Sequence, residues 1–314
     1  MSIKTAEFVS PGHPDKICDF IADSILDAFL EGDKDSRVAV EVMGGHGLIT
    51  VNGEVTSNAS PNLEPLVKKI VGEDYNVVIK LSKQSSEISR GVDTGGAGDQ
   101  GVMKGYATAE TESMMPREYE LARSLCMKIY EKYPYDGKVQ VTLEGDKVKT
   151  VVASFQNSKN EDLLSLVQSI IKAEEYLINP AGEWVQGGFD ADTGLSGRKI
   201  VIDNYGPEIP IGGGSFSGKD CTKVDRSGAY MARKIAVDII KSGKAKEVFV
   251  KVAYAIGKAE PVMAVVFLDG KEENIEGYDL TPKGIKKMLA LENVKFKETS
   301  RWGHFGRSGF PWEK

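Results

Sequence analysis

The sequence lacks the patterns that mark membrane, secreted and zinc-stabilised proteins. No run of 18 apolar residues occurs, so no transmembrane helix is expected. Residues 1–16 contain no apolar h-region, so we expect no secretory signal and a cytoplasmic location. Cys18, Cys126 and Cys221 lie far apart and outside any C-x-x-C pair, so neither a disulfide framework nor a structural zinc site is expected.

Basic residues are outnumbered by acidic ones, and the sequence contains few histidines. The formal net charge is −6 at pH 7, so the sequence predicts neither a nucleic-acid nor a membrane partner, although a local basic pocket is compatible with an acidic total. The three histidines, His13, His46 and His304, are scattered. The sequence shows no Ser-His or Cys-His arrangement of the kind used in nucleophilic catalysis.

What the sequence does contain is an ordinary globular composition arranged as a repeat. Hydrophobic residues make up 41% and charged residues 27% of the 314 residues, which is enough chain for two or three domains. A helix, a strand pair and a second helix recur three times at a period of roughly 100–110 residues, too long for a solenoid. This repeat predicts three similar α+β domains, which we expect at 1–98, 99–186 and 187–314 with some exchange of segments.

Apolar periodicity predicts the elements of each unit. Helices are expected from Pro14 and over 62–72, 117–131, 161–172, 226–241 and 282–291, and strands over 38–43, 48–57, 138–156 (two strands), 247–257 and 261–270. The pair Asn52-Gly53, between alternating apolar residues, predicts a hairpin turn. On the first helix, Asp19, Asp23 and Asp27 recur every four residues, which is typical of a solvated face.

The glycine-rich connector 179–220 ends in GGGSFSGKD, one residue short of a P-loop signature because Asp220 stands where Ser or Thr is required. A P-loop also needs a strand directly before it and a helix directly after its lysine. Here the preceding strand is expected to end near Tyr205, and the next helix to begin near Asp225. The segment is therefore interpreted as a polyphosphate cradle of another kind, with free backbone N–H groups and Lys219 as its cation.

The stretch GHPDK (12–16) places charged side chains at a helix start. A helix N-terminus attracts anions, and His13 and Lys16 would add to a phosphate-facing corner. Beside phosphates, Asp15 could hold a Mg²⁺ ion. An ordinary helix start with incidental charge fits these residues equally well.

Two other stretches are weaker signals. In GAGDQG (96–101), Asp99 would suit a polar ligand edge, but a turn closed by an Asx hydrogen bond is the simpler interpretation. In DADTGLSGRKI (190–200), Arg198 and Lys199 precede an expected apolar strand, VIDNY, and basic residues at strand starts are common on surfaces.

Six motifs together resemble the S-adenosylmethionine synthetase (methionine adenosyltransferase) family. In the family's order they are GHPDK, GAGDQG, GLSGRK, GGGSFSGKDCTKVDRS, AYAIGKAEP and GHFGRSGFPWEK. The resemblance runs from Glu7 to the last residue. It implies that family's α+β fold, with three similar domains related by internal pseudo-threefold symmetry, in agreement with the repeat.

The resemblance also implies an activity. Family members make S-adenosylmethionine from ATP and L-methionine: the methionine sulfur attacks C5′ of ATP, and the triphosphate leaves and is hydrolysed to pyrophosphate and phosphate. Such a displacement needs alignment and cations rather than a nucleophile from the protein. The alternatives are an ATP-dependent triphosphatase or transferase with an altered acceptor, and a non-catalytic regulatory subunit.

The motifs carry the family's site residues onto this sequence as implied roles. ATP contacts are implied for His13, Asp99, Asp136, Lys138, Trp184, Asp192, Arg198, Lys199, Ser215 and Lys219. Catalytic roles at the leaving triphosphate are implied for His13, Lys138, Arg198, Lys219 and Lys223. Methionine contacts are implied for Glu54, Arg90, Asp192 and Lys223. The implied metal ligands are Asp15 and Asp225 for two Mg²⁺ ions and Glu41 for K⁺.

The resemblance further implies a homodimer with shared active sites, or a tetramer of two such dimers. The sequence departs from the family pattern before GAGDQG, where only Thr94 and Gly95 separate that motif from GVD in place of a mobile lid. Arg90 also stands where the family commonly has a Gln. A shorter lid predicts weaker closure and a broader acceptance of methionine analogues.

Overall fold

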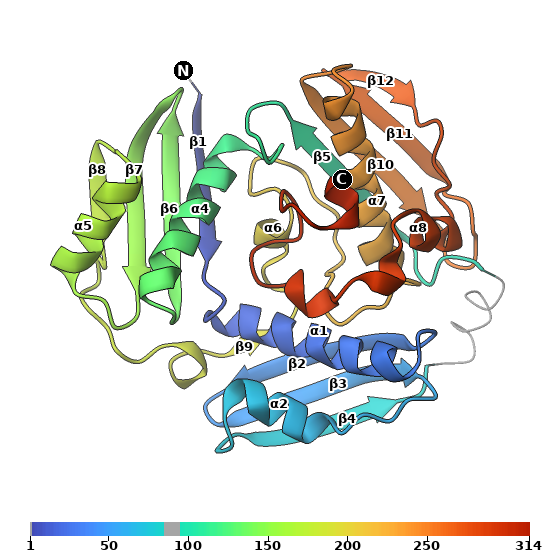
Figure 1. The fold of residues 1–314 in the computed structure, drawn as a ribbon, viewed down its shortest axis with the longest axis horizontal. Helices are drawn as coiled ribbons and strands as arrows, with labels where there is room; N and C mark the ends of the chain where they lie inside the picture. Colours follow the sequence, from blue (N-terminus) through green and yellow to red (C-terminus); the bar gives the residue numbers. More distant parts are fainter. Residues whose placement is uncertain (1, 85–94) are drawn as a thin grey trace.

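The helices and strands of the computed structural model, which describes residues 2–84 and 95–314, form three lobes around a C-terminal segment (Figure 1). The strands are β1 (Ile3–Val9), β2 (Arg37–Gly45), β3 (Leu48–Thr56), β4 (Asn76–Ser82), β5 (Gly101–Thr108), β6 (Gly137–Glu144), β7 (Lys147–Phe155), β8 (Glu175–Ile178), β9 (Gly194–Leu195), β10 (Glu247–Tyr254), β11 (Met263–Leu268) and β12 (Lys271–Asn274). The helices are α1 (Pro14–Gly32), α2 (Leu63–Val71), α4 (Arg117–Lys132), α5 (Asn160–Ile170), α6 (Ile200–Asp203), α7 (Val224–Lys241) and α8 (Pro282–Met288).

The predicted elements are confirmed in their type and approximate bounds, with two corrections. The predicted hairpin turn at Asn52-Gly53 is wrong: both residues lie inside β3, and the β2–β3 turn is formed by His46 and Gly47. Gly53 is required for a different reason, since a Cβ there would lie 2.1 Å from the carbonyl oxygen of Ala39 on the neighbouring strand. The glycine of this Asn-Gly pair is therefore needed because the backbones of β2 and β3 approach closely there, and it does not form a turn.

The second correction concerns VIDNY, which was expected to be a strand. Its first residues form the short helix α6, whose end is closed by hydrogen bonds from Asp203 N to Lys199 O (2.8 Å) and from Asn204 N to Ile200 O (3.1 Å). This turn brings the buried Asp203 carboxylate to Lys16 Nζ at 2.5 Å. The buried ion pair therefore outweighs the local strand preference of the apolar residues.

The described residues form three four-stranded sheets, and each sheet takes its first strand from elsewhere in the chain. The strand orders are β9-β2-β3-β4, β1-β6-β7-β8 and β5-β10-β11-β12. In all three, the borrowed strand runs antiparallel to the first strand of a hairpin. The pseudo-threefold repeat expected from the sequence is thus completed by strands that cross the contiguous ranges, while the exact domain boundaries stay a prediction.

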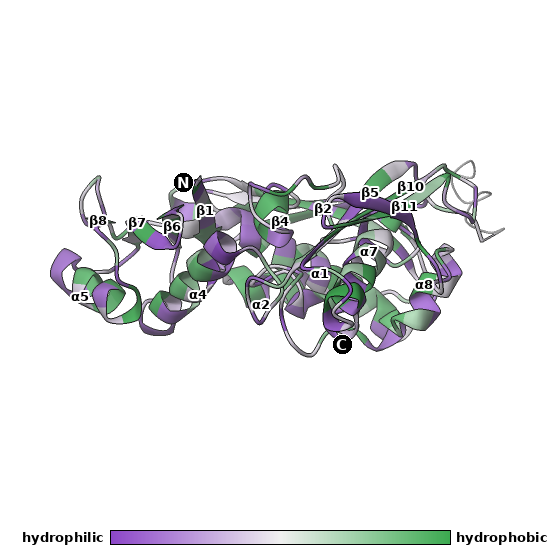
Figure 2. Cartoon of the chain, turned by 90° about the horizontal axis from the view of Figure 1, so that it is seen from above, coloured by the Kyte–Doolittle hydropathy of each residue, from purple (hydrophilic) through white to green (hydrophobic). Residues whose placement is uncertain are grey.

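The helices and sheets are separated into two layers. In Figure 2 the helices lie along one side of a flattened molecule and the strands along the other. α1, α4 and α7 each precede a hairpin and pack against its sheet, and the largest buried side chains include Phe8, Tyr119 and Trp312. The outer faces of the sheets are therefore left without a helical cover. Across the described ranges, no helix is both long and apolar enough to cross a membrane.

Candidate active site

The first part of the site is the N-terminus of α1. Pro14 occupies the first helical turn, and His13 is the N-cap in an extended conformation. The His13 Nδ1 accepts a hydrogen bond from the backbone N–H of Asp15 at 3.1 Å. Burial, aided by the charge of Lys199, lowers the pKa of His13 to about 4. The imidazole is therefore neutral at pH 7, and because Nδ1 is an acceptor, Nε2 carries the proton.

Asp15 connects this corner to the segment GLSGRK. One carboxylate oxygen accepts from Leu195 N at 2.9 Å, and the other forms an ion pair with Lys199 Nζ. Burial alone would raise the pKa of Asp15, but the hydrogen bonds from Lys199 and Leu195 and the charge of Lys199 together outweigh burial, and the pKa is lowered. Asp15 is thus an anion at neutral pH and holds a cationic side chain beside the neutral His13.

The acidic stripe of α1 is buried, so the expectation of a solvated face is wrong. Asp19 and Asp23 are 0% exposed and Asp27 is 9% exposed. Each carboxylate accepts a backbone N–H of a segment far away in sequence: Asp19 from Gly197 (2.8 Å), Asp23 from Gly218 (2.8 Å), and Asp27 from Phe296 (2.9 Å) and Lys297 (3.1 Å). The stripe is the support on which both glycine-rich motifs rest.

Asp23 is also half of a closed ion pair with Arg226 of α7. The two guanidinium NH groups of Arg226 donate to the two oxygens of Asp23 at 2.7 Å each, and both side chains are fully buried. The remaining donors reach Lys219 O (3.0 Å), Tyr230 Oη (3.0 Å) and Thr299 Oγ1 (3.1 Å). Such a satisfied bidentate pair fixes α1 to α7.

The segment 212–219 forms the second part of the site. The backbone at Gly214 approaches the Asp225 carboxylate so closely that a Cβ there would lie 2.1 Å from Cγ. Gly218 has a φ of +77° and packs against the carbonyl of Val40. Lys219 Nζ then donates to Asp225 Oδ2 at 2.7 Å. The glycines thus create a narrow cradle beside a paired lysine and carboxylate.

The structure agrees with the argument against a P-loop. The helix after the lysine begins only at Val224, and no strand directly precedes 212–220 in the described chain. Asp220, at the position of the P-loop hydroxyl, is a buried anchor: its carboxylate accepts from Val38 N and Thr222 N, both at 2.8 Å. The bond from Val38 N ties the segment to β2, and the bond from Thr222 N closes its own loop.

A cavity of about 620 Å³ opens beside this cradle and brings together Glu41, Ser215 and Lys219. The Glu41 carboxylate forms a hydrogen bond with Ser196 Oγ, and burial raises the pKa of Glu41. Met43 and Leu195, both exposed residues on the outer sheet face, line the same cavity. The cavity therefore opens toward the side of the molecule that no helix covers.

The remaining basic residues differ in how available their charges are. Lys138 lies on β6, half exposed, in an ion pair with Glu7. Arg198 is exposed. Lys223 is buried and its Nζ donates to Asp220 Oδ1 at 2.5 Å, so it is held within its own loop rather than in the lining of the cavity.

Several expected ligand contacts lie around His13. The charges of Asp192 and Lys138 both act on the pKa of His13, and burial raises the pKa of Asp136, whose Oδ2 accepts from Gly188 N at 3.0 Å. The half-buried Trp184 ring packs beside Gly187, next to this corner.

Two expected residues, Asp99 and Glu54, are not joined to either cluster by a hydrogen bond. Asp99 is exposed, and its Oδ1 accepts from the N–H of the next residue, Gln100, at 2.7 Å. Glu54 is exposed on β3, although its negative charge contributes to raising the pKa of Glu41. Arg90, together with the shortened segment that contains it, lies outside the described residues.

The residues that the sequence interpretation missed are the supporting ones, above all Asp19, Asp23 and Ser196. One signal could have found the aspartates: Lys16 is the single basic residue within 14–32, whereas a solvated helix of this length ordinarily mixes both signs of charge.

Comparisons with known proteins cover the whole chain. Three family models match in sequence order: "S-adenosylmethionine synthetase, N-terminal domain" over residues 1–93, the central domain over 94–184 and the C-terminal domain over 186–314. An S-adenosylmethionine synthase of Thermus thermophilus is 42% identical over 379 aligned positions, covering 100% of this chain and 96% of the relative. One from Deinococcus deserti is 40% identical, covering 99% and 96%. Because the alignments are longer than 314 residues, the relatives carry internal segments that this chain lacks.

Proposed function

The chain belongs to the S-adenosylmethionine synthetase family, and from this premise we infer that it makes S-adenosylmethionine from ATP and L-methionine at the two clusters around His13 and Lys219. The observation that carries the assignment to this place is the cradle 212–219, with Lys219 and Asp225 at its edge and a cavity of about 620 Å³ beside it. The family assignment does not favour a triphosphatase or a regulatory subunit.

The reaction is a displacement at carbon. A lone pair of the methionine sulfur forms the new bond to C5′, the C5′–O5′ bond breaks, and its electron pair leaves with the triphosphate. Negative charge builds on the leaving oxygens, so preorganised cations lower the barrier. We assign this task first to Lys219 and Lys199, which are partly buried and each paired with one aspartate. Lys138 and Arg198 are more exposed cations assigned to the same task.

His13 has a property that suits the leaving oxygen. Its imidazole is neutral because burial lowers its pKa to about 4, and its Nε2 carries the proton because Nδ1 already accepts from Asp15 N. We assign it the role of hydrogen-bond donor to the departing oxygen. A neutral donor can stabilise developing negative charge without a change of protonation state between pH 6 and 8.

The family uses divalent and monovalent cations, and the donor set here fits ions that bind mainly through the substrate. Among the described residues, no three His, Cys, Asp or Glu side chains converge, so the protein offers each ion few ligands of its own. Asp15 and Asp225 would each give one carboxylate to a Mg²⁺ ion, and Glu41 one to K⁺. Mg²⁺ prefers this combination of one or two carboxylates with phosphate oxygens, and when bound it would neutralise triphosphate charge.

The outer sheet faces support a homodimer. Eight strands each expose a large apolar side chain: Ile3, Met43, Leu48, Val78, Val102, Leu177, Leu195 and Met263. Extended apolar surface of this kind is typical of protein interfaces. Since the cavity opens toward the same side, a second copy placed there would complete each active site. The variant Val78→Glu adds a charge to this face. Sedimentation of this variant should therefore show a monomer.

One assay tests the proposed activity. The chain is incubated with ATP, Mg²⁺ and K⁺, with and without methionine, and the sulfonium product, pyrophosphate and phosphate are measured. We expect all three products only when methionine is present. Phosphate release that is independent of methionine would identify a triphosphatase, and the absence of any turnover would identify a binding subunit.

A further inference from the structure

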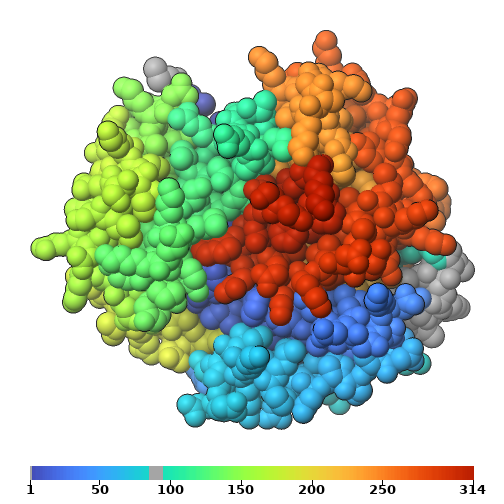
Figure 3. Space-filling model, in the orientation of Figure 1, coloured from blue at the N-terminus to red at the C-terminus, as the bar shows by residue number. Residues whose placement is uncertain are grey.

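A larger cavity lies on the helix side of the molecule, and one end of it reaches Gly12, Lys16 and Gly187 beside the His13 corner. It has a volume of about 920 Å³ and follows α1 between α2 and the C-terminal segment 295–301. Figure 3 shows the surface of α1 uncovered between these two neighbours. None of the residues assigned above to ATP, methionine or metal ions is among those that line it.

The floor of this groove is one stripe of α1. Its members follow at spacings of three or four residues and are Ile17, Phe20, Ser24, Ala28 and Glu31. With a rise of 1.5 Å per residue, the stripe is about 21 Å long, or roughly four helical turns. Leu66 and Ile70 of α2 extend the apolar surface onto one wall. A helix stripe with this spacing is the surface against which another helix packs.

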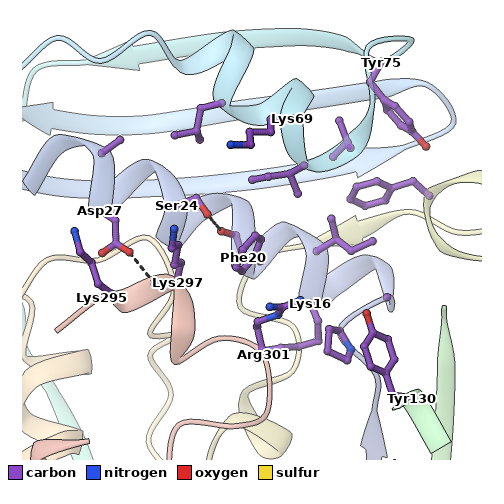
Figure 4. Close-up of a pocket in the computed structure, with 18 of the residues that line it drawn as sticks. Lys16, Phe20, Ser24, Asp27, Lys69, Tyr75, Tyr130, Lys295, Lys297 and Arg301 are labelled. Atoms are coloured by element: carbon purple, nitrogen blue, oxygen red, sulfur yellow. Dashed lines mark hydrogen bonds between the residues drawn. The ribbon is translucent and has the colours of Figure 1, made fainter. Parts of the chain in front are cut away.

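Five basic and three acidic residues line the groove, although the chain as a whole is acidic. Lys69 projects from α2 on one side, and Lys297 and Arg301 from the C-terminal segment on the other (Figure 4). Within residues 2–84 and 95–314, no carboxylate lies within 4.0 Å of these three cations. The Arg301 guanidinium instead lies 5.2 Å from the centre of the Phe20 ring, over the floor. Their charges are therefore available to an acidic partner.

We propose that this groove binds an acidic amphipathic helix of a partner protein. The groove combines the apolar floor residues Ile17, Phe20 and Ala28 with cations on both walls, which is complementary to a helix whose apolar stripe is flanked by Asp or Glu. Its length fits a helix of about 14 residues. The bound helix would cover α1 on the helix side, so it would leave the outer sheet faces and the catalytic cavity free.

The test uses the full chain and two fluorescent peptides of 16 residues. The first carries Leu at positions of one helical stripe, Glu on both flanks and Ala elsewhere; the second has Lys in place of each Glu. We expect the acidic peptide to bind and the basic peptide not to bind. The triple variant Lys69→Glu/Lys297→Glu/Arg301→Glu should weaken binding of the acidic peptide by at least about tenfold, because like charges then face each other.

Two further variants separate groove binding from general charge attraction. The control Lys128→Glu/Lys172→Glu/Lys283→Glu makes the same charge change on exposed lysines outside the groove, and should weaken binding less than twofold. Ala28→Arg adds positive charge but obstructs the floor, so it should abolish binding. Unchanged binding by Ala28→Arg, equal weakening by the control, or no binding of the acidic peptide up to 1 mM would each overturn the proposal. Turnover of ATP and methionine by the three variants should stay at the wild-type level.

Discussion

Two ion pairs next to each other in the chain have opposite surroundings. Arg226 and Asp23 are fully buried, and every donor of the guanidinium has a partner. The preceding residue, Asp225, pairs with Lys219 at the edge of a cavity, and the two side chains are 13% and 18% exposed. Similar chemistry therefore serves two purposes: the closed pair joins α1 to α7, and the open pair keeps a charge available for a ligand.

Breaking the closed pair should have the largest effect. The variant Asp23→Asn leaves the Arg226 charge buried without a counter-charge, which we expect to lower the free energy of unfolding by about 3–5 kcal/mol. Urea titration followed by circular dichroism measures this loss. The control Asp35→Asn changes an exposed carboxylate, 94% exposed, and should be within about 0.5 kcal/mol of wild type. Equal stability of the two variants would contradict the structural role of the closed pair.

Breaking the open pair should affect catalysis instead of folding. Lys219→Met removes a cation from the leaving triphosphate, and we expect kcat to fall by about 10²–10³-fold. The urea midpoint should move little, because Asp225 remains partly exposed after the change. Lys128→Met, on the exposed surface of α4, is the matched control. An unchanged kcat in Lys219→Met would remove this residue from the reaction.

A pair of adjacent glycines tests how the open pair is positioned. A Cβ at Gly214 would overlap the Asp225 carboxylate, whereas a Cβ at Gly213 would have no atom within 4 Å. Gly214→Ala should therefore lower kcat/KM by about tenfold or more through displacement of Asp225. Gly213→Ala should behave like wild type in the same assay. If both variants keep full activity, the cradle does not depend on a close approach at Gly214.

The pH dependence of stability tests the buried surroundings of Arg226, and its expected effect is the smallest. Burial, and then the Arg226 charge, lower the pKa of His304 well below 6.5. The unfolded chain therefore binds one more proton than the folded chain once the pH falls below about 6.5, so this contribution to stability is present above that pH and lost below it. We expect a slope of up to about 1.4 kcal/mol per pH unit from this residue.

The variant His304→Gln measures that slope by difference. Urea titrations at pH 7.5 and pH 5.5 should show a smaller loss of stability for His304→Gln than for wild type. His46→Gln, which changes an exposed turn histidine, is the matched control. A variant His304→Gln with the full wild-type slope would show that other groups cause the acid sensitivity.

The sequence was sufficient for features that depend on neighbours close in the chain. Apolar spacing predicted α1 and α7, and the glycine and residue context of 212–220 excluded a P-loop. It was insufficient where partners are distant. Asp23 lies 203 residues from Arg226, and the Asp27 carboxylate meets backbone groups about 270 residues away. Spacing on one helix contains no information on such partners, so a buried acidic stripe resembled a solvated one.

The borrowed strands also determine when the chain can fold during its synthesis. Three pairings join distant parts of the chain: β2 with β9, β5 with β10, and β1 with β6, the last across 136 residues. A ribosome-bound chain that ends before residue 194 lacks β9 and therefore has no complete first sheet. The partner of β5, β10, is synthesised later still. Contacts of such sequence separation form slowly, and unpaired edges are exposed meanwhile. We therefore expect folding to be largely post-translational and cooperative among the three lobes, instead of proceeding lobe by lobe from the N-terminus.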